Sequence, residues 1–168
     1  MRRLVAHKAI AFAYGLDFSQ QHEPVNVMLG YPMRLTRQKG GYVATFRDIS
    51  EALTSGRTKA AALDMAADAL ATAMEFYLED RRPVPPPSKP RRGEDVVELP
   101  ASVAVKVLLL NEMLKTGTTP AQLARALDAS PQTVTRIVDL RHATKIDTLA
   151  EAFRAIGKKL TISVDDAA

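Results

Sequence analysis

Apolar and polar residues alternate along two short stretches in the first third of the chain, residues 31–36 and 42–46. An alternation with a period of two is that of a strand with one buried face. Residues 38–41 lie between them and read Gln-Lys-Gly-Gly, and the two glycines supply the positive φ angles that a tight hairpin turn requires. The pattern therefore predicts a β-hairpin, followed after a bend at 48–51 by a third short strand near 53–55.

A helical period replaces the alternation from residue 59 to residue 78, and Thr58 before it is a good N-cap. The apolar residues that lie three or four apart form one stripe: Leu63, Ala66, Leu70, Met74 and Tyr77. We expect this stripe to cover the apolar face of the hairpin. A short apolar run at 96–99, ended by Pro100, would return as a last strand. The first half thus predicts an α+β fold, with one small sheet covered by one helix.

The second half has helical periodicity throughout. Residues 101–115 predict a helix that ends at Gly117, and its inward stripe is Val103, Val107, Leu110 and Leu114. Two later pairs, Thr119-Pro120 and Ser130-Pro131, each combine an N-cap residue with proline at the first helical position. They predict two short helices joined by a turn, before a further helix at 146–156. A short alternation at 160–164 predicts a strand, which we expect to pair with a second copy in a homodimer or higher oligomer.

Charge and proline concentrate between the two halves. Residues 81–93 carry five basic residues, no acidic residue and five of the ten prolines, while the whole chain has a net charge of +4. This composition predicts a semi-rigid, solvated connector between a domain of residues 30–80 plus 94–99 and a domain of residues 100–164. Contact with phosphates or with a proline-recognition module is the alternative. Residues 1–29 form an N-terminal extension, and we hypothesise that synthesis normally begins at Met28.

Catalytic and metal-binding chemistry has little support. The chain has no cysteine and three histidines, His7, His22 and His142, which lie far apart in sequence. A metal-dependent nuclease needs converging carboxylates, but the two hairpin strands contain none, and Asp64 and Asp68 fit a solvated helix face. We therefore expect no enzyme activity, no metal and no cofactor. No apolar run approaches 18 residues, so we expect no membrane partner. The absence of cysteine fits a reducing compartment, and we expect a cytoplasmic protein.

The two short helices carry a specific spacing. Ala124 is small and is followed by Leu127, Val134 and Ile137 at +3, +10 and +13. This pattern resembles the helix-turn-helix of the Cro/Xre-type repressors, with Asp128 where that family often has glycine. The alternative is an ordinary helical bundle with solvated polar residues.

In the helix-turn-helix interpretation, the helix at 131–140 would enter the major groove of DNA with its first residues at the base edges. The residues predicted to read bases are Gln132, Thr133, Thr135 and Arg136. The residues predicted to contact phosphates are Thr119, Ser130, Arg141 and Lys145. A motif charge of +2 over residues 117–146 agrees with such a partner.

Taken together, residues 30–164 resemble the long form of the HicB antitoxins, which carries a C-terminal helix-turn-helix. The matching stretches are 31–32, 40–42, 46–49, 51–54, Gly56, 76–80, 103–111 and 142–147. The resemblance implies a degraded RNase H-like first domain without nuclease activity. It also implies a partner, a HicA-type mRNA-cleaving toxin, and operator DNA as a second partner. A stand-alone DNA-binding regulator with a ligand-sensing first domain is the alternative function.

Overall fold

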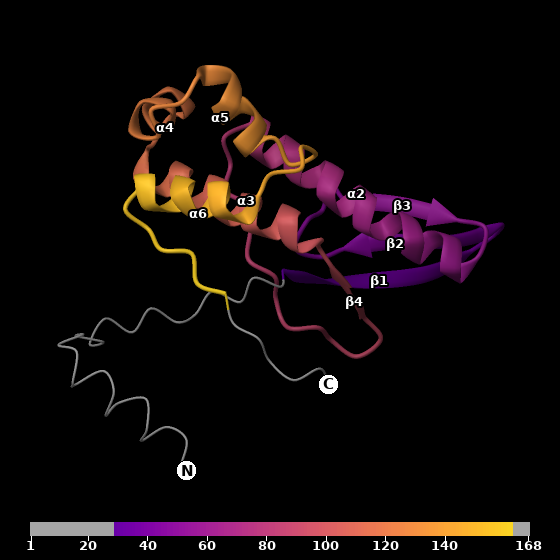
Figure 1. Ribbon diagram of the computed structural model, residues 1–168. Helices are drawn as coiled ribbons and strands as arrows, with labels where there is room; N and C mark the ends of the chain where they lie inside the picture. Colours follow the sequence, from indigo (N-terminus) through magenta and orange to yellow (C-terminus); the bar gives the residue numbers. More distant parts are fainter. Residues whose placement is uncertain (1–28, 163–168) are drawn as a thin grey trace, which may run out of the picture.

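The computed structural model describes residues 29–162. The elements in chain order are β1 (Gly30–Gln38), β2 (Gly41–Phe46), β3 (Leu53–Gly56), α2 (Lys59–Glu79), β4 (Asp95–Glu98), α3 (Ala101–Thr116), α4 (Pro120–Ala126), α5 (Pro131–Val138) and α6 (Ile146–Ala155). Figure 1 shows the strands at one end of the molecule and α4 and α5 at the other, with α3 and α6 between them. The fold is therefore α+β, as the sequence predicts.

The sheet is antiparallel, with the strand order β3-β2-β1-β4. The predicted hairpin is confirmed, because β1 and β2 pair through Met33 opposite Phe46 and Gly40 has a φ of 102° in the turn. The predicted third and last strands are present too. β4 pairs with β1, with Tyr31 opposite Val97, so the last strand joins the side of the hairpin that β3 leaves free.

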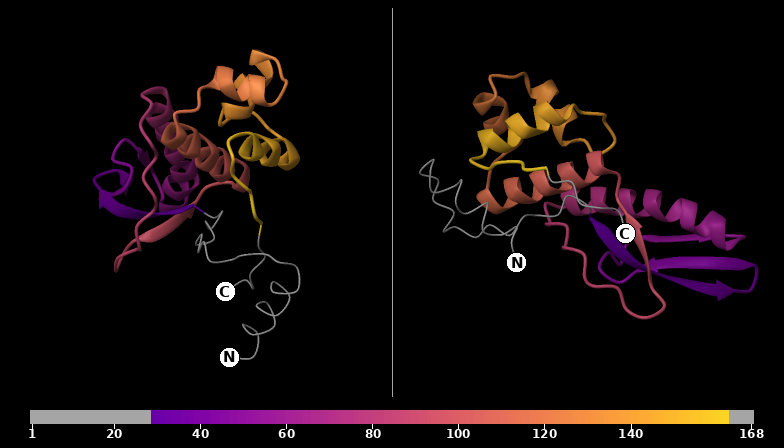
Figure 2. Two further views of the ribbon diagram at one scale, coloured as in Figure 1. Left: turned by 90° about the vertical axis from the view of Figure 1, so that its left-hand side faces the viewer. Right: turned by 60° about the horizontal axis from the view of Figure 1, so that its bottom comes forward.

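Helix α2 covers one face of the sheet (Figure 2). Thr58 is its N-cap and its side chain accepts a hydrogen bond from the Ala61 amide at 3.1 Å. The buried residues of α2 are Ala62, Ala66, Leu70, Ala73, Met74 and Tyr77. They pack with Tyr31, Met33 and Phe46 of the strands in a first core. The predicted stripe is therefore confirmed except at Leu63, which is only partly buried.

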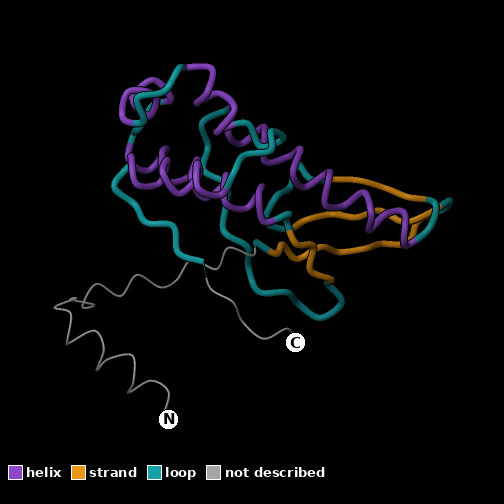
Figure 3. The backbone as a smooth tube through the Cα atoms, viewed as in Figure 1, coloured by secondary structure: helices purple, strands orange, loops and turns teal. Residues whose placement is uncertain are grey.

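The segment between α2 and β4 is a long loop (Figure 3), yet it is not simply solvated. Val84 is buried in the first core, and the side chain of Asn111 bonds both its amide and its carbonyl at 2.9 Å. The hydroxyl of Tyr31 donates to the Pro85 carbonyl at 2.7 Å, and the Ser88 amide donates to Asp48 at 2.8 Å. Most of residues 81–93 are exposed, as the predicted solvated connector requires, but Val84 is buried and polar groups of the neighbouring elements find partners in this loop.

Helix α3 lies between two cores. Ala104 and Val107 belong to the first core, while Val105, Leu109 and Met113 belong to a second one with α4, α5 and α6. The predicted stripe is confirmed at Val107, and Val103 and Leu110 are partly buried against the first core. Leu114 is only partly buried, and the prediction omits the second buried stripe of Val105, Leu109 and Met113. A helix that packs on both sides buries two stripes, and the periodicity of one stripe cannot describe it.

The C-terminal elements depart from the predictions at two places. Helix α5 ends at Val138 rather than at residue 140, and Leu140 inserts into the first core. Leu160, Thr161 and Ile162 pair with no strand of this chain within residues 29–162, and their predicted pairing with a second copy stays a prediction. The remaining two residues of the predicted strand, 163–164, lie outside the described part of the chain, as do residues 1–28 of the predicted extension.

Candidate nucleic-acid interface

Helices α4 and α5 begin as the sequence predicts. The Thr119 hydroxyl accepts the Gln122 amide at 3.2 Å, and the Gln122 side chain accepts the Thr119 amide at 2.8 Å, which makes a capping box. Ser130 caps α5 by accepting the Thr133 amide at 3.2 Å. Since Pro120 and Pro131 occupy the first helical positions, both helix starts are fixed by local sequence.

The turn between the two helices depends on Asp128, whose φ is 49°. The Ala129 amide donates to the Ala124 carbonyl at 2.9 Å, and the Asp128 amide donates to the Arg125 carbonyl at 3.3 Å. This pair of bonds is a Schellman motif, which ends α4 and lets the chain reverse toward α5. Aspartate thus adopts the left-handed conformation that is usually taken by glycine.

Three of the four residues predicted to form the core between α4 and α5 are buried. Ala124, Val134 and Ile137 have exposures of 6% or less, while Leu127 is partly buried. They pack against Leu149 and other residues of α6 in the second core.

The predicted base-reading residues all lie on the exposed surface of α5. The Thr133 hydroxyl is bonded to Ser130 at 2.9 Å, and the Thr135 hydroxyl donates to the Pro131 carbonyl at 3.1 Å. Gln132 and Arg136 lie one helical turn apart, and neither side chain has a polar partner within residues 29–162. These two side chains are therefore the ones available to a ligand on this face.

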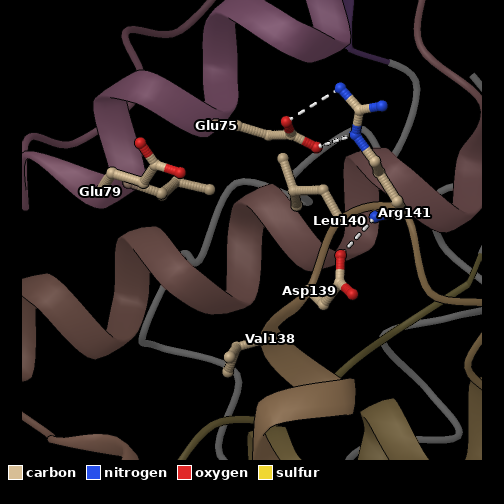
Figure 4. Close-up of a pocket in the computed structure, with 7 residues that line it drawn as sticks. Glu75, Glu79, Val138, Asp139, Leu140 and Arg141 are labelled. Atoms are coloured by element: carbon tan, nitrogen blue, oxygen red, sulfur yellow. Dashed lines mark hydrogen bonds and ion pairs between the residues drawn. The ribbon is translucent and has the colours of Figure 1, made fainter.

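The predicted phosphate contacts differ in their availability. Thr119, Ser130 and Lys145 are exposed at helix starts. Arg141 is exposed as well, but its Nε donates to Glu75 Oε1 at 2.6 Å and its Nη2 to Oε2 at 3.1 Å. The pair borders a pocket of about 310 Å³ between α2 and the end of α5 (Figure 4). Arg141 therefore joins the two halves of the molecule, and its contact with phosphate stays a prediction.

A residue that the sequence analysis missed lies behind α5. Lys106 of α3 is completely buried, and its ammonium donates to the main-chain carbonyls of Arg136, Asp139 and His142. Burial lowers its pKa, because desolvation disfavours the charged form. The available signal was one cation in an otherwise apolar run at 103–110.

The acidic residues of the first half form no evident metal site. Asp64 and Asp68 are exposed, and no group of three or more metal-ligating side chains occurs in the described portion of the chain. Glu51 is instead engaged by Tyr77, whose hydroxyl donates to it at 2.7 Å, and by Arg82 at 3.2 Å. Among residues 29–162, no helix is long and apolar enough to cross a membrane.

Comparisons with known proteins identify the family of this chain. Residues 30–108 match a family described as HicB_like antitoxin of bacterial toxin-antitoxin system. The chain is 54% identical over 132 residues to Antitoxin HicB 2 of Photorhabdus laumondii, covering 79% of this chain and 94% of that protein. It is 47% identical over 133 residues to Antitoxin HicB of Escherichia coli K12, covering 79% and 96%. The chain therefore belongs to the HicB-like family of bacterial antitoxins.

Proposed function

We propose that this antitoxin neutralises a HicA-type, mRNA-cleaving toxin in the cytoplasm and represses its own operon, without catalysis of its own. The α4–α5 pair acts as the helix-turn-helix in this proposal, and an oligomer presents two copies of it to the operator. The sheet of β1, β2 and β3 followed by α2 would be the remnant of an RNase H-like domain. Family membership supports the toxin partner.

The observation that carries the DNA-binding proposal is the exposed pair Gln132 and Arg136 on α5. Side chains one turn apart on a helix point the same way. Glutamine can bond adenine and arginine can bond guanine with two hydrogen bonds each, which gives sequence discrimination. Behind them, Val134 and Ile137 hold the helix on the second core.

Substitution of Arg136 tests this proposal. Arg136→Ala should weaken operator binding by about 1–3 kcal/mol and relax specificity at one base. Lys145→Ala is the matched control, because removal of a phosphate contact should weaken binding to all sequences and reduce the salt slope by about 1. Titration of the DNA upstream of the gene measures both. An unchanged operator affinity for Arg136→Ala would show that α5 does not read bases through this residue.

The toxin proposal is tested by co-expression with the neighbouring reading frame, which we expect to encode a short basic protein with a catalytic histidine. The neighbour alone should arrest growth, and both proteins together should restore growth and co-purify. A neighbour that is harmless by itself, or that does not bind this chain, contradicts the proposal.

One observation favours the alternative of a ligand-sensing regulator. A pocket of about 560 Å³ lies between α2, the start of α3 and residues 140–143. Its size is within the range of small-molecule sites. Growth rescue by co-expression distinguishes the two functions, since a stand-alone regulator would not protect cells from a toxin.

A further inference from the structure

Lys106 lies where the two cores meet. Its neighbours Val105 and Val107 belong to the second and the first core, respectively. Among residues 29–162 it is the one charged residue that is buried as a whole, with an exposure of 0%. A buried charge is strongly unfavourable unless it is paired or hydrogen-bonded, so its partners decide what this residue does.

All of the partners found for this ammonium are main-chain carbonyls at or beyond the end of α5. Lys106 Nζ lies 3.3 Å from the Arg136 carbonyl and 2.5 Å from the Asp139 carbonyl, and it also donates to the His142 carbonyl. The last carbonyls of a helix lack partners within the helix and carry its partial negative charge. The ammonium therefore satisfies the end of α5 and holds the following loop at the same point.

The first of these carbonyls belongs to Arg136, whose side chain is exposed. Helix α5 has eight residues and is about 12 Å long at 1.5 Å per residue. Val134 and Ile137 are its buried residues, and Val138 is partly buried against the second core. Apolar contacts are not directional, whereas the hydrogen bonds to the Arg136 carbonyl in the last turn and to the Asp139 carbonyl at the C-cap have a defined geometry that fixes this end of the helix.

We propose that Lys106 is a positioning residue for DNA reading, which holds the C-terminal end of α5 so that Arg136 meets its base. The proposal rests on the proposed DNA-binding function. Lys106 itself touches no DNA, so it acts on sequence discrimination rather than on the general attraction to phosphates.

Lys106→Met tests the proposal, because methionine keeps most of the apolar stem and removes the donors. Operator affinity should fall about tenfold or more, as for loss of one base contact, with non-specific DNA affinity within about twofold. Asn111→Ala is the matched control. It removes another polar anchor of α3, but one that binds Val84 in the first half. We expect it to lower thermal stability without changing the ratio of operator to non-specific affinity.

Each binding titration is made at a temperature where circular dichroism shows the full-length variant folded. Lys106→Gln, which keeps two N–H donors on a shorter side chain, replaces Lys106→Met if that variant does not fold. The double variant with Arg136→Ala should bind the operator only slightly more weakly than Arg136→Ala alone, because both act through one contact.

An unchanged affinity ratio for Lys106→Met overturns the inference, and so does an equal drop for Asn111→Ala or full additivity with Arg136→Ala. A wild-type protein that shows no preference for its operator overturns the proposed DNA-binding function and the inference together. The wild-type titration therefore separates failure of the inference from failure of the function.

Discussion

At the scale of single residues, one cluster on the surface links the loop after β2 to the end of α2. The Tyr77 hydroxyl donates to Glu51 Oε2 at 2.7 Å, Arg82 donates to Oε1 at 3.2 Å, and the guanidinium of Arg82 lies 4.2 Å from the centre of the Tyr77 ring. The hydrogen bond from Tyr77 is the largest influence on Glu51 and lowers the pKa of this carboxyl from 4.5 to about 2. Folding is therefore linked to the protonation of Glu51.

The sign of this linkage gives a pH prediction. A lowered pKa means that Glu51 stabilises the fold above pH 4.5 and that this contribution is lost as the pH falls toward 2. Tyr77→Phe should raise the pKa of Glu51 toward 4.5, so that acidification from pH 5 to pH 3 lowers the urea midpoint less than in the wild type. Tyr42→Phe is the control, since no hydrogen bond of its hydroxyl occurs within residues 29–162. Identical acid slopes for Tyr77→Phe and the wild type would contradict the prediction.

The sequence predicts some polar residues and not others for a physical reason. Thr58, Thr119 and Ser130 were identified as caps because their partners lie three residues along the chain. Lys106 bonds residues 30–36 positions away, and Arg141 bonds Glu75 across 66 positions. Periodicity and capping rules describe near neighbours, so contacts that close only in the folded chain leave little trace in them.

At the scale of elements, several helices end in the same way. Helices α2, α3, α4 and α6 all end in a Schellman motif. In each, one amide donates to the carbonyl five residues earlier, and the amide just before it donates to the carbonyl three residues before its own position. The residue with the positive φ in each motif is 81, 117, 128 or 157. Two of these four positions are glycine, and the others are Arg81 and Asp128. At Arg81 and Asp128 the native fold already contains the strain of a residue with a Cβ in the left-handed backbone conformation.

This difference predicts an ordering of two alanine substitutions. Gly117→Ala should lower the free energy of unfolding by about 1–2 kcal/mol, because a Cβ there adds left-handed strain. No atom lies within 4 Å of that Cβ, so packing does not contribute. Asp128→Ala should cost less, about 0–1 kcal/mol, since that position is strained already. Urea unfolding of both variants measures the order, and a neutral Gly117→Ala would contradict it.

The sequence predicts correctly the strands and helices that bury one face, and it describes incompletely the helix α3, which buries two. The hairpin, α2 and the starts of α4 and α5 follow from period and caps. The predicted stripe of α3 was incomplete, because Ala104 belongs to the first core and its neighbour Val105 to the second. Residues 160–162 pair with no described strand of their own chain, and pairing of 160–164 with a second copy stays a prediction, because alternation alone supplies no partner strand.

At the scale of the whole molecule, the division into halves is less complete than composition indicates. Leu140, which follows the proposed reading helix, is buried in the first core, and Arg141 bonds Glu75 of α2. Val84 and Asn111 join the proline-rich loop to α3. A conformational change in the sheet domain could therefore be transmitted to the end of α5 through the contacts of Leu140 and Arg141.

The pairing of β4 with β1 also sets an order of events on the ribosome. One edge of β1 has no strand partner until Asp95–Glu98 has been synthesised. At about 5–20 residues per second, the emerging hairpin waits roughly several seconds for that partner. Such an open edge can template association with other chains. Only two residues separate β4 from α3. The helices that would read DNA are therefore synthesised after all four strands of the sheet.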